Sequence, residues 1–144
     1  MSNKIKARGN GAQNDKDSIL VEAKKLLAIL HYALPNVPKI YRQQSAYSHM
    51  IQAALTIIEE FHLAREYKED RILHQKRMAA KYAVLSAMLE ECDELGYVTK
   101  ADELKICQIL DRMDDGIRRW KSVTRSPRSQ EREEVVKEGY PAPR

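Results

Sequence analysis

The chain has 144 residues, the length of one domain rather than two, and its five Gly, five Pro and 6% aromatic residues favour helices over a sheet. No apolar run approaches the ~20 residues of a membrane span, and the polar N-terminus lacks the apolar core of a secretory signal, so we expect a cytoplasmic protein. The formal net charge is +4, but residues 17–121 balance 16 Lys and Arg against 16 Asp and Glu, so attraction to polyanions requires local patches of cations.

The positive excess lies in the two polar ends of the chain. Residues 1–16 are rich in Asn, Gly and Lys and carry a formal charge of +3. Residues 122–144 are polar, contain Pro and carry +1. Segments of this composition bury too little apolar surface to fold by themselves. We therefore predict a disordered basic arm at 1–16, one folded domain at 17–121 and a disordered polar tail at 122–144.

The first helix is expected from about Asp17 to Ala33. Asp17 or Ser18 can cap its free amide groups, and Pro35 stops it, because proline excludes the helical conformation from the residue before it. Its expected apolar line is Leu20, Ala23, Leu27, Leu30 and Leu34.

The second helix is expected from Pro38 to about Tyr67, since proline is favourable in the first turn of a helix. No Gly or Pro occurs between Lys39 and Leu95, so the break before the third helix is placed near residues 68–70, where the apolar pattern lapses. The residues expected on the buried face are Tyr41, Tyr47, Met50, Ile51, Ala54, Leu55, Ile58 and Phe61.

The third helix is expected from about Asp70 to Leu95, and Gly96 supplies the left-handed residue that ends it. Its expected buried line is Ala80, Val84, Leu85, Met88, Cys92 and Leu95. The fourth helix begins at Thr99, which forms an approximate capping box with Asp102, and runs to about Lys121. Its expected buried line is Leu104, Cys107, Leu110, Met113, Ile117 and Trp120.

Four long amphipathic helices with short connections predict an all-α fold, an up-down-up-down four-helix bundle. In this topology the junction of the second and third helices shares one end of the molecule with the end of the fourth. The cations expected at this end are Arg65, Lys68, Arg71, Lys76, Arg77, Arg118, Arg119 and Lys121. The residues expected at the opposite, acidic end are Glu90, Glu91, Asp93, Glu94, Asp102 and Glu103, partly offset by Lys39, Arg42 and Lys100.

Catalytic and metal-binding patterns are weak in this chain. Residues 59–62 contain one Glu-x-x-His motif, whereas a di-iron site in a bundle core requires two. Cys92 and Cys107 lack the CxxC spacing of a zinc site, and a reducing compartment fits them better than a disulfide. There is no P-loop, GxGxxG or GxSxG motif. We expect no metal, no cofactor and no enzymatic activity.

One row of basic residues remains as a candidate binding feature. Arg71, His74, Arg77 and Lys81 recur at spacings of three, three and four, so they share a face of the third helix. Such a row can follow a phosphate backbone, and its binding would weaken with salt. The alternative is a solvated face whose cations pair with neighbouring glutamates.

The order of features over residues 20–121 resembles the accessory variability determinant (Avd) family of diversity-generating retroelements. The resemblance rests on four stretches: LLAILHYALPNVPKIYR at 26–42, AALTIIEEFHLAREY at 53–67, the long helix at 77–95, and ILDRMDDGIRRW at 109–120. The first pairs an apolar helix with a Pro-x-x-x-Arg pattern, and the last ends in the only Trp of the chain.

The resemblance implies a four-helix bundle that assembles into a homopentamer and binds the retroelement reverse transcriptase and its template RNA, and possibly cDNA. Such a protein supports mutagenic cDNA synthesis without being the polymerase. From charge position, not from matched motif residues, we expect nucleic-acid or polymerase contacts at Arg65, Lys68, Arg71, Arg77, Lys81, Arg112, Arg118 and Arg119.

A second interpretation stays open on the residues themselves. The chain is similar in shape to the four-helix-bundle proteins encoded in ribosomal RNA intervening sequences. It would then be a helical protein–protein adaptor with no role in nucleic-acid binding.

Overall fold

The computed structural model describes residues 11–42 and 45–125, and within them the chain is helical with no strand. Its four long helices are α2 (Gly11–Ala33), α3 (Ala46–Glu66), α4 (Arg71–Glu94) and α5 (Lys100–Thr124). Three short 3-10 helices, η1 (Leu34–Asn36), η2 (Lys39–Tyr41) and η3 (Lys68–Asp70), lie in the connections. The predicted all-α class is confirmed. None of the helices in these residues is both long enough and apolar enough to cross a membrane.

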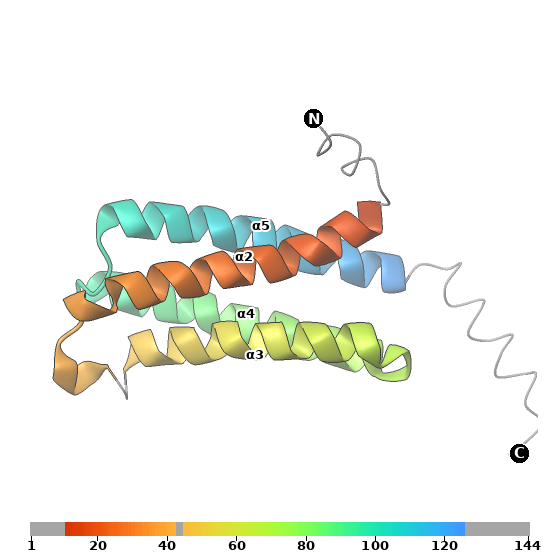
Figure 1. Ribbon diagram of the computed structural model, residues 1–144, viewed down its shortest axis with the longest axis horizontal. Coiled ribbons are helices and arrows are strands. Elements are labelled where there is room, and N and C mark those ends of the chain that lie inside the picture. Colours follow the sequence, from red (N-terminus) through yellow and green to blue (C-terminus); the bar gives the residue numbers. More distant parts are fainter. Residues whose placement is uncertain (1–10, 43–44, 126–144) are drawn as a thin grey trace, which may run out of the picture.

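The helices pack as two close pairs around one core. α3 lies along α4 and α2 lies along α5, and smaller contacts of α2 with α3 and of α4 with α5 join the pairs. Figure 1 shows the α2–α3 and α4–α5 connections at one end of the molecule and the α3–α4 connection at the other. The C-terminal end of α5 lies at the same end as the α3–α4 connection.

The predicted start of the first helix is wrong, and both long outer helices extend into the predicted polar ends. α2 begins at Gly11, so Asp17 and Ser18 lie inside the helix and do not cap it. Residues 11–16 and 122–124, predicted to belong to the polar ends, continue α2 and α5. The remainder of those ends, 1–10 and 126–144, lies outside the described residues.

The second long helix begins at Ala46 rather than at Pro38. Ser45 caps it through a reciprocal capping box, in which the Ser48 amide donates to the Ser45 hydroxyl and the Ser45 amide donates to the Ser48 hydroxyl. Pro38 instead precedes η2 in an extended conformation. Arg42 stabilises this connection, because its Nε donates to the Val37 carbonyl at 2.9 Å and its Nη2 to the Pro35 carbonyl at 3.2 Å.

The α4–α5 turn follows the prediction. Gly96 has φ +75°, and the amide of Tyr97 donates to the Cys92 carbonyl, which closes the end of α4. Thr99 then caps α5 by accepting a hydrogen bond from the Asp102 amide at 3.1 Å. The end of α4 and the start of α5 therefore lie within one residue of their predicted positions.

The core differs from the predicted apolar lines on α2 and α3. On α2, Ile19 and Leu26 are fully buried, while Leu20 and Leu27 of the predicted line are only half-buried, as is Leu34 in η1. On α3, Leu55 is 43% exposed although it was predicted inside. The Tyr41 side chain lies outside the described residues. The buried face of α3 consists of Tyr47, Met50, Ala53, Ala54, Ile57, Glu60, Phe61 and Ala64.

The predicted line of α4 is wrong at three of its six positions. Ala80, Val84 and Leu95 are exposed, whereas α4 turns His74, Gln75, Met78, Leu85, Leu89 and Cys92 inward. Two of those inward residues are polar, so apolar spacing alone selects the wrong side of the first half of the helix. On α5, Leu104 and Cys107 are exposed as well, and the buried line begins at Ile106.

Replacing Gly96 by Ala is expected to lower the free energy of unfolding by about 1 kcal/mol, because an L residue at positive φ is strained. No heavy atom lies within 4 Å of the position of an added Cβ, so the loss arises from backbone conformation alone. Chemical denaturation measures it, and Gly96→Asn should lose less because Asn tolerates this conformation. Equal stability of Gly96→Ala and the parent chain would contradict the prediction.

Candidate nucleic-acid interface

The end of the molecule that contains the α3–α4 connection gathers several of the predicted contact residues. Arg65, Lys68 and Arg71 flank this connection. The end of α5 is held against the start of α4, since Gln75 Nε2 donates to Thr124 Oγ1 at 2.9 Å. Glu66, Glu69 and Asp70 share the connection, so its own charge is balanced. Lys76 in the second turn of α4 and Lys121 and Arg125 at the end of α5 lie at this end as well, whereas Lys81 stands ten residues into α4, about 15 Å from its start.

The Arg71 side chain makes its hydrogen bonds within the protein. Its Nε donates to the Ala64 carbonyl at 2.8 Å, and its Nη2 donates to the Arg65 carbonyl at 3.3 Å. These carbonyls belong to the last turn of α3, where a cation also interacts favourably with the helix dipole. The guanidinium carbon lies 5.8 Å from the centroid of the Trp120 ring. Arg71 thus joins α3, α4 and α5, and a phosphate would have to compete with these contacts.

Arg65 lies over the neighbouring aromatic ring. Its guanidinium carbon is 5.4 Å from the centroid of Phe61, and its Nη2 is 3.1 Å from His62 Nδ1. The Phe61 and Trp120 rings pack with their centroids 5.5 Å apart. Arg65 and Arg71 together cover this aromatic pair, yet Arg65 remains exposed and has an accessible charge.

The four remaining arginines of the predicted set each pair with a carboxylate. Arg118 and Arg119 contact Asp114 and Asp115 one turn earlier on α5, at 2.8 Å and 3.1 Å. Arg112 contacts Glu22 on α2 at 2.9 Å, and Arg77 lies 3.8 Å from Glu60 on α3. Among the eight predicted contacts, only Lys68 and Lys81 have exposed side chains that make no ion pair or hydrogen bond with any residue that the structure describes.

The predicted basic row on the third helix is interrupted. His74 is 8% exposed and its Nδ1 lies 2.8 Å from the carboxylate of Glu60, which is itself 7% exposed. Arg71 points back to α3, so only Arg77 and Lys81 of this row reach solvent. A buried carboxylate is costly unless it is paired, and this requirement places His74 inside.

The Glu-x-x-His motif at 59–62 does not assemble a site, because Glu59 and His62 are both exposed. Within the described residues no three His, Cys, Asp or Glu side chains gather as metal ligands. The buried, paired carboxylate of this stretch is the next residue, Glu60, which sequence reasoning missed. A signal was present, since Glu60 lies three residues after Ile57 and four before Ala64, on the apolar face of the helix.

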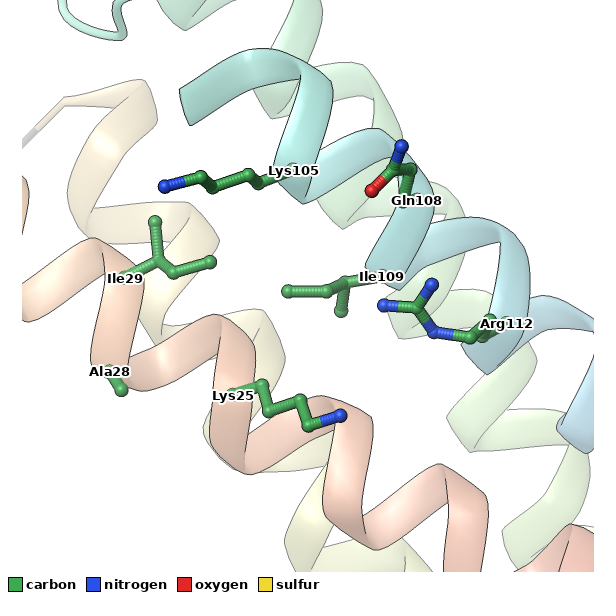
Figure 2. A pocket seen from close by; sticks show the side chains of 7 residues that line it. All are labelled: Lys25, Ala28, Ile29, Lys105, Gln108, Ile109 and Arg112. Atoms are coloured by element: carbon green, nitrogen blue, oxygen red, sulfur yellow. The ribbon is translucent and has the colours of Figure 1, made fainter. Parts of the chain in front are cut away.

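An open groove lies between α2 and α5, and it too was missed. Its floor is apolar, and the side chains of Ile29 and Ile109 point into the space between the two helices (Figure 2). Lys25, Lys105 and Arg112 form its rim. Glu22, which is 4% exposed, accepts from Lys25 at 3.3 Å and from Arg112 at 2.9 Å, so it fixes two of these cations.

The cysteines are free thiols in different environments. Cys92 is buried, and this burial, with a smaller contribution from the Glu91 carboxylate, raises the pKa of its thiol to about 11. Cys107 is exposed, and partial burial followed by the nearby Glu103 carboxylate raises the pKa of that thiol as well. Because the thiolate is the nucleophile, neither residue has the low pKa of a catalytic cysteine.

Comparisons of the chain with protein-family models, with curated proteins and with solved structures find no match.

Arg71→Ala is expected to lower the free energy of unfolding by about 2 kcal/mol, because two carbonyls at the end of α3 lose a charged donor. Lys68→Ala, at an exposed position three residues earlier, should change stability by less than about 0.5 kcal/mol. Arg71→Lys keeps the charge but not the forked donor and should fall between them. Denaturant titration of the three variants checks this order, and equal stabilities would refute the structural role of Arg71.

Thiol labelling at pH 8 should modify Cys107 and spare Cys92. Both pKa values are raised above this pH, so exposure decides the rate, and Cys92 is 0% exposed. Titration with an aromatic disulfide reagent should count one thiol in the folded chain and two in denaturant, since the chain has two cysteines. Labelling of both thiols at equal rates in the folded chain would show that α4 does not bury Cys92.

Proposed function

We propose that this chain is a non-catalytic accessory protein of a diversity-generating retroelement. In this proposal it binds the reverse transcriptase and the template RNA and supports mutagenic cDNA synthesis. The resemblance to the Avd family over residues 20–121 suggests the role. The observation that supports it in the structure is a set of exposed lysines, Lys68 in the α3–α4 connection and Lys76 and Lys81 on the first half of α4, whose side chains have no ion pair or hydrogen bond to a described residue.

The proposal includes the finer organisation predicted for the chain. The four helices would run up-down-up-down, and polar segments at 1–16 and 122–144 would flank the bundle. The protein would act in the cytoplasm as a homo-oligomer. The arrangement of the connections in Figure 1 is consistent with this course of the helices.

Unpaired lysines suit RNA phosphates for a physical reason. A cation held by a carboxylate must give up that partner before it binds phosphate, whereas a solvated lysine loses only water and mobility. Binding then releases counterions from the RNA, which makes the affinity fall as salt rises. By this criterion Lys68 and Lys81 rank above Arg112, Arg118 and Arg119 as RNA contacts.

A second candidate function, a protein–protein adaptor, is favoured by the groove between α2 and α5. An apolar floor with a cationic rim suits an acidic peptide that also carries an aliphatic side chain. An adaptor of this kind would be sensitive to changes in the groove and would bind no RNA.

Binding of a fluorescein-labelled single-stranded RNA of mixed sequence across a salt series tests the proposal. In Lys68→Glu/Lys81→Glu the slope of log affinity against log salt should fall by at least about 1.4, since each phosphate contact on a single strand contributes about 0.7. The fold should be unaffected, because both side chains are exposed.

The matched control is Lys39→Glu/Lys105→Glu, which makes the same change in formal charge with exposed lysines of the α2–α3 connection and the first turns of α5. For this control, the slope of log affinity against log salt should match that of the parent chain. Equal losses in both variants would mean that net charge, not this surface, attracts RNA. If the parent chain has no RNA affinity even at low salt, the proposed function is wrong and the protein–protein adaptor becomes the favoured function.

A further inference from the structure

The groove between α2 and α5 has the chemistry of a site for an acidic segment that also carries an aliphatic side chain. Its floor is apolar, since Ile29 is half-buried and Ile109 is 4% exposed. Its volume of about 320 Å³ is at the lower end of the roughly 300–1,000 Å³ of ligand sites, so the groove has room for a few side chains. Three cations, Lys25, Lys105 and Arg112, form its rim.

Part of the positive charge at this rim is uncompensated. The buried Glu22 accepts from Lys25 and from the Nε of Arg112. The Arg112 side chain is 51% exposed, so the two Nη groups of its guanidinium can bind a second carboxylate. Lys105 is exposed and makes no ion pair or hydrogen bond with a residue in the described ranges, 11–42 and 45–125. One carboxylate against three cations leaves the rim positive.

A sequence of matching chemistry lies near the C-terminus, outside the described residues. Residues 131–138 read EREEVVKE, which places four glutamates around the adjacent Val135 and Val136. These two are the only branched aliphatic residues between positions 126 and 144. In an extended segment alternate side chains point to the same side, so Glu134, Val136 and Glu138 would share one side.

We propose that residues 134–138 dock in extended form in the α2–α5 groove of their own chain. Val136 covers the apolar floor formed by Ile29 and Ile109 (Figure 2). The two glutamates on the same side of the segment, at positions 134 and 138, bind the cations of the rim. The groove is then closed to an external acidic peptide until that peptide displaces the segment.

The spacing of the two glutamates fits the spacing of the rim. Glu134 and Glu138 are four residues apart, about 13 Å in an extended segment. Lys105 and Arg112 are seven residues apart, about 10.5 Å along α5. The two lengths agree to within the reach of these long side chains. In Figure 2 Lys105 lies toward one end of the groove, and Arg112 and the end of the Lys25 side chain lie toward the other.

The chain is long enough to reach the groove, and it arrives from the Arg112 end. α5 ends at Thr124, so Arg112 lies about 18 Å and Lys105 about 28.5 Å back along the helix. Glu134 follows Thr124 by ten residues and Glu138 by fourteen, which extend to about 33 Å and about 46 Å. This length exceeds both distances, so the chain can turn back along α5 and place Glu134 at Arg112 and Glu138 at Lys105.

Charge complementarity selects this occupant over the other end of the chain. Residues 1–10 contain Ile5 but carry three cations and no Asp or Glu, so the positive rim repels them. A contact within one chain joins no copies, so it is as compatible with a homopentamer as with a monomer. The lysines proposed to bind RNA lie on α4 and in the α3–α4 connection, outside the groove. Residues 126–144 balance four cations against four glutamates, so docking of the segment does not rest on the proposed RNA role.

Disulfide trapping in the full chain tests the contact. With the exposed Cys107 removed by Cys107→Ser, Ala28→Cys in the groove is combined with Val136→Cys, since cysteine is a small apolar side chain that the floor can accept. Oxidised glutathione should close this bridge at least about tenfold faster than in the control Ala87→Cys/Val136→Cys, because docking raises the local concentration of one thiol at the other. Gel mobility without reductant and mass spectrometry of the linked peptides measure the bridge.

The control makes the same substitution at another exposed alanine. Gln75 contacts Thr124, so Ala87, twelve residues further along α4, stands about 18 Å from the end of α5. Ala28 lines the groove with Ile109, which stands about 22.5 Å from that end. A segment that moves without docking therefore meets Ala87 at least as often as Ala28.

Charge reversal shows whether the rim holds the segment. In the Ala28→Cys/Val136→Cys chain, Glu134→Lys/Glu138→Lys should remove the rate advantage. Glu131→Lys/Glu133→Lys makes the same change in formal charge on the opposite side of the extended segment and should keep the advantage. Far-ultraviolet circular dichroism shows that each variant stays helical.

Three results would overturn the proposal. The bridge could form at equal rates at Ala28→Cys and Ala87→Cys. The fast rate could persist in Glu134→Lys/Glu138→Lys, which would mean that the rim does not hold the segment. The bridge could join two chains, at a rate that rises with protein concentration, which would place the segment on another copy. RNA affinity enters none of these measurements, so the proposed function is tested separately.

Discussion

Two buried carboxylates organise this structure, one in each close pair of helices. Glu60 on α3 is compensated by His74 and Arg77 on α4, and Glu22 on α2 is compensated by Arg112 on α5. A carboxylate removed from water destabilises the fold unless a cation or donor reaches it. If the helices of a pair slid or rotated against each other, a buried carboxylate would lose its partner. The register of the bundle therefore depends on these contacts.

The same requirement divides the basic residues into two groups. Arginines serve the fold: they compensate carboxylates, and Arg71 also caps α3 and covers Trp120. Their planar, forked guanidinium groups suit such contacts with several acceptors. Exposed lysines such as Lys68 and Lys81 take no part in these contacts, so no described residue compensates their charge. Lysine is not confined to the second group, since Lys25 pairs with Glu22 and Lys100 pairs with Asp93.

α4 packs one face into the core and leaves apolar residues exposed on another. Its inner face includes polar residues, His74 and Gln75, which the core accepts because Glu60 and Thr124 reach them. Its outer face keeps apolar and small residues in solvent, with Val84 at the centre.

The sequence by itself determined the helical class and the features that depend on nearby atoms. Gly96 and Thr99 were predicted at the α4–α5 turn because their hydrogen bonds close within a few residues. Only the tertiary structure decided which sides of the helices are buried and which cations are free. Glu60 meets His74 across 14 residues, and Glu22 meets Arg112 across 90. Whether a carboxylate can be buried depends on what another helix brings to it, and spacing within one helix carries no information about that partner.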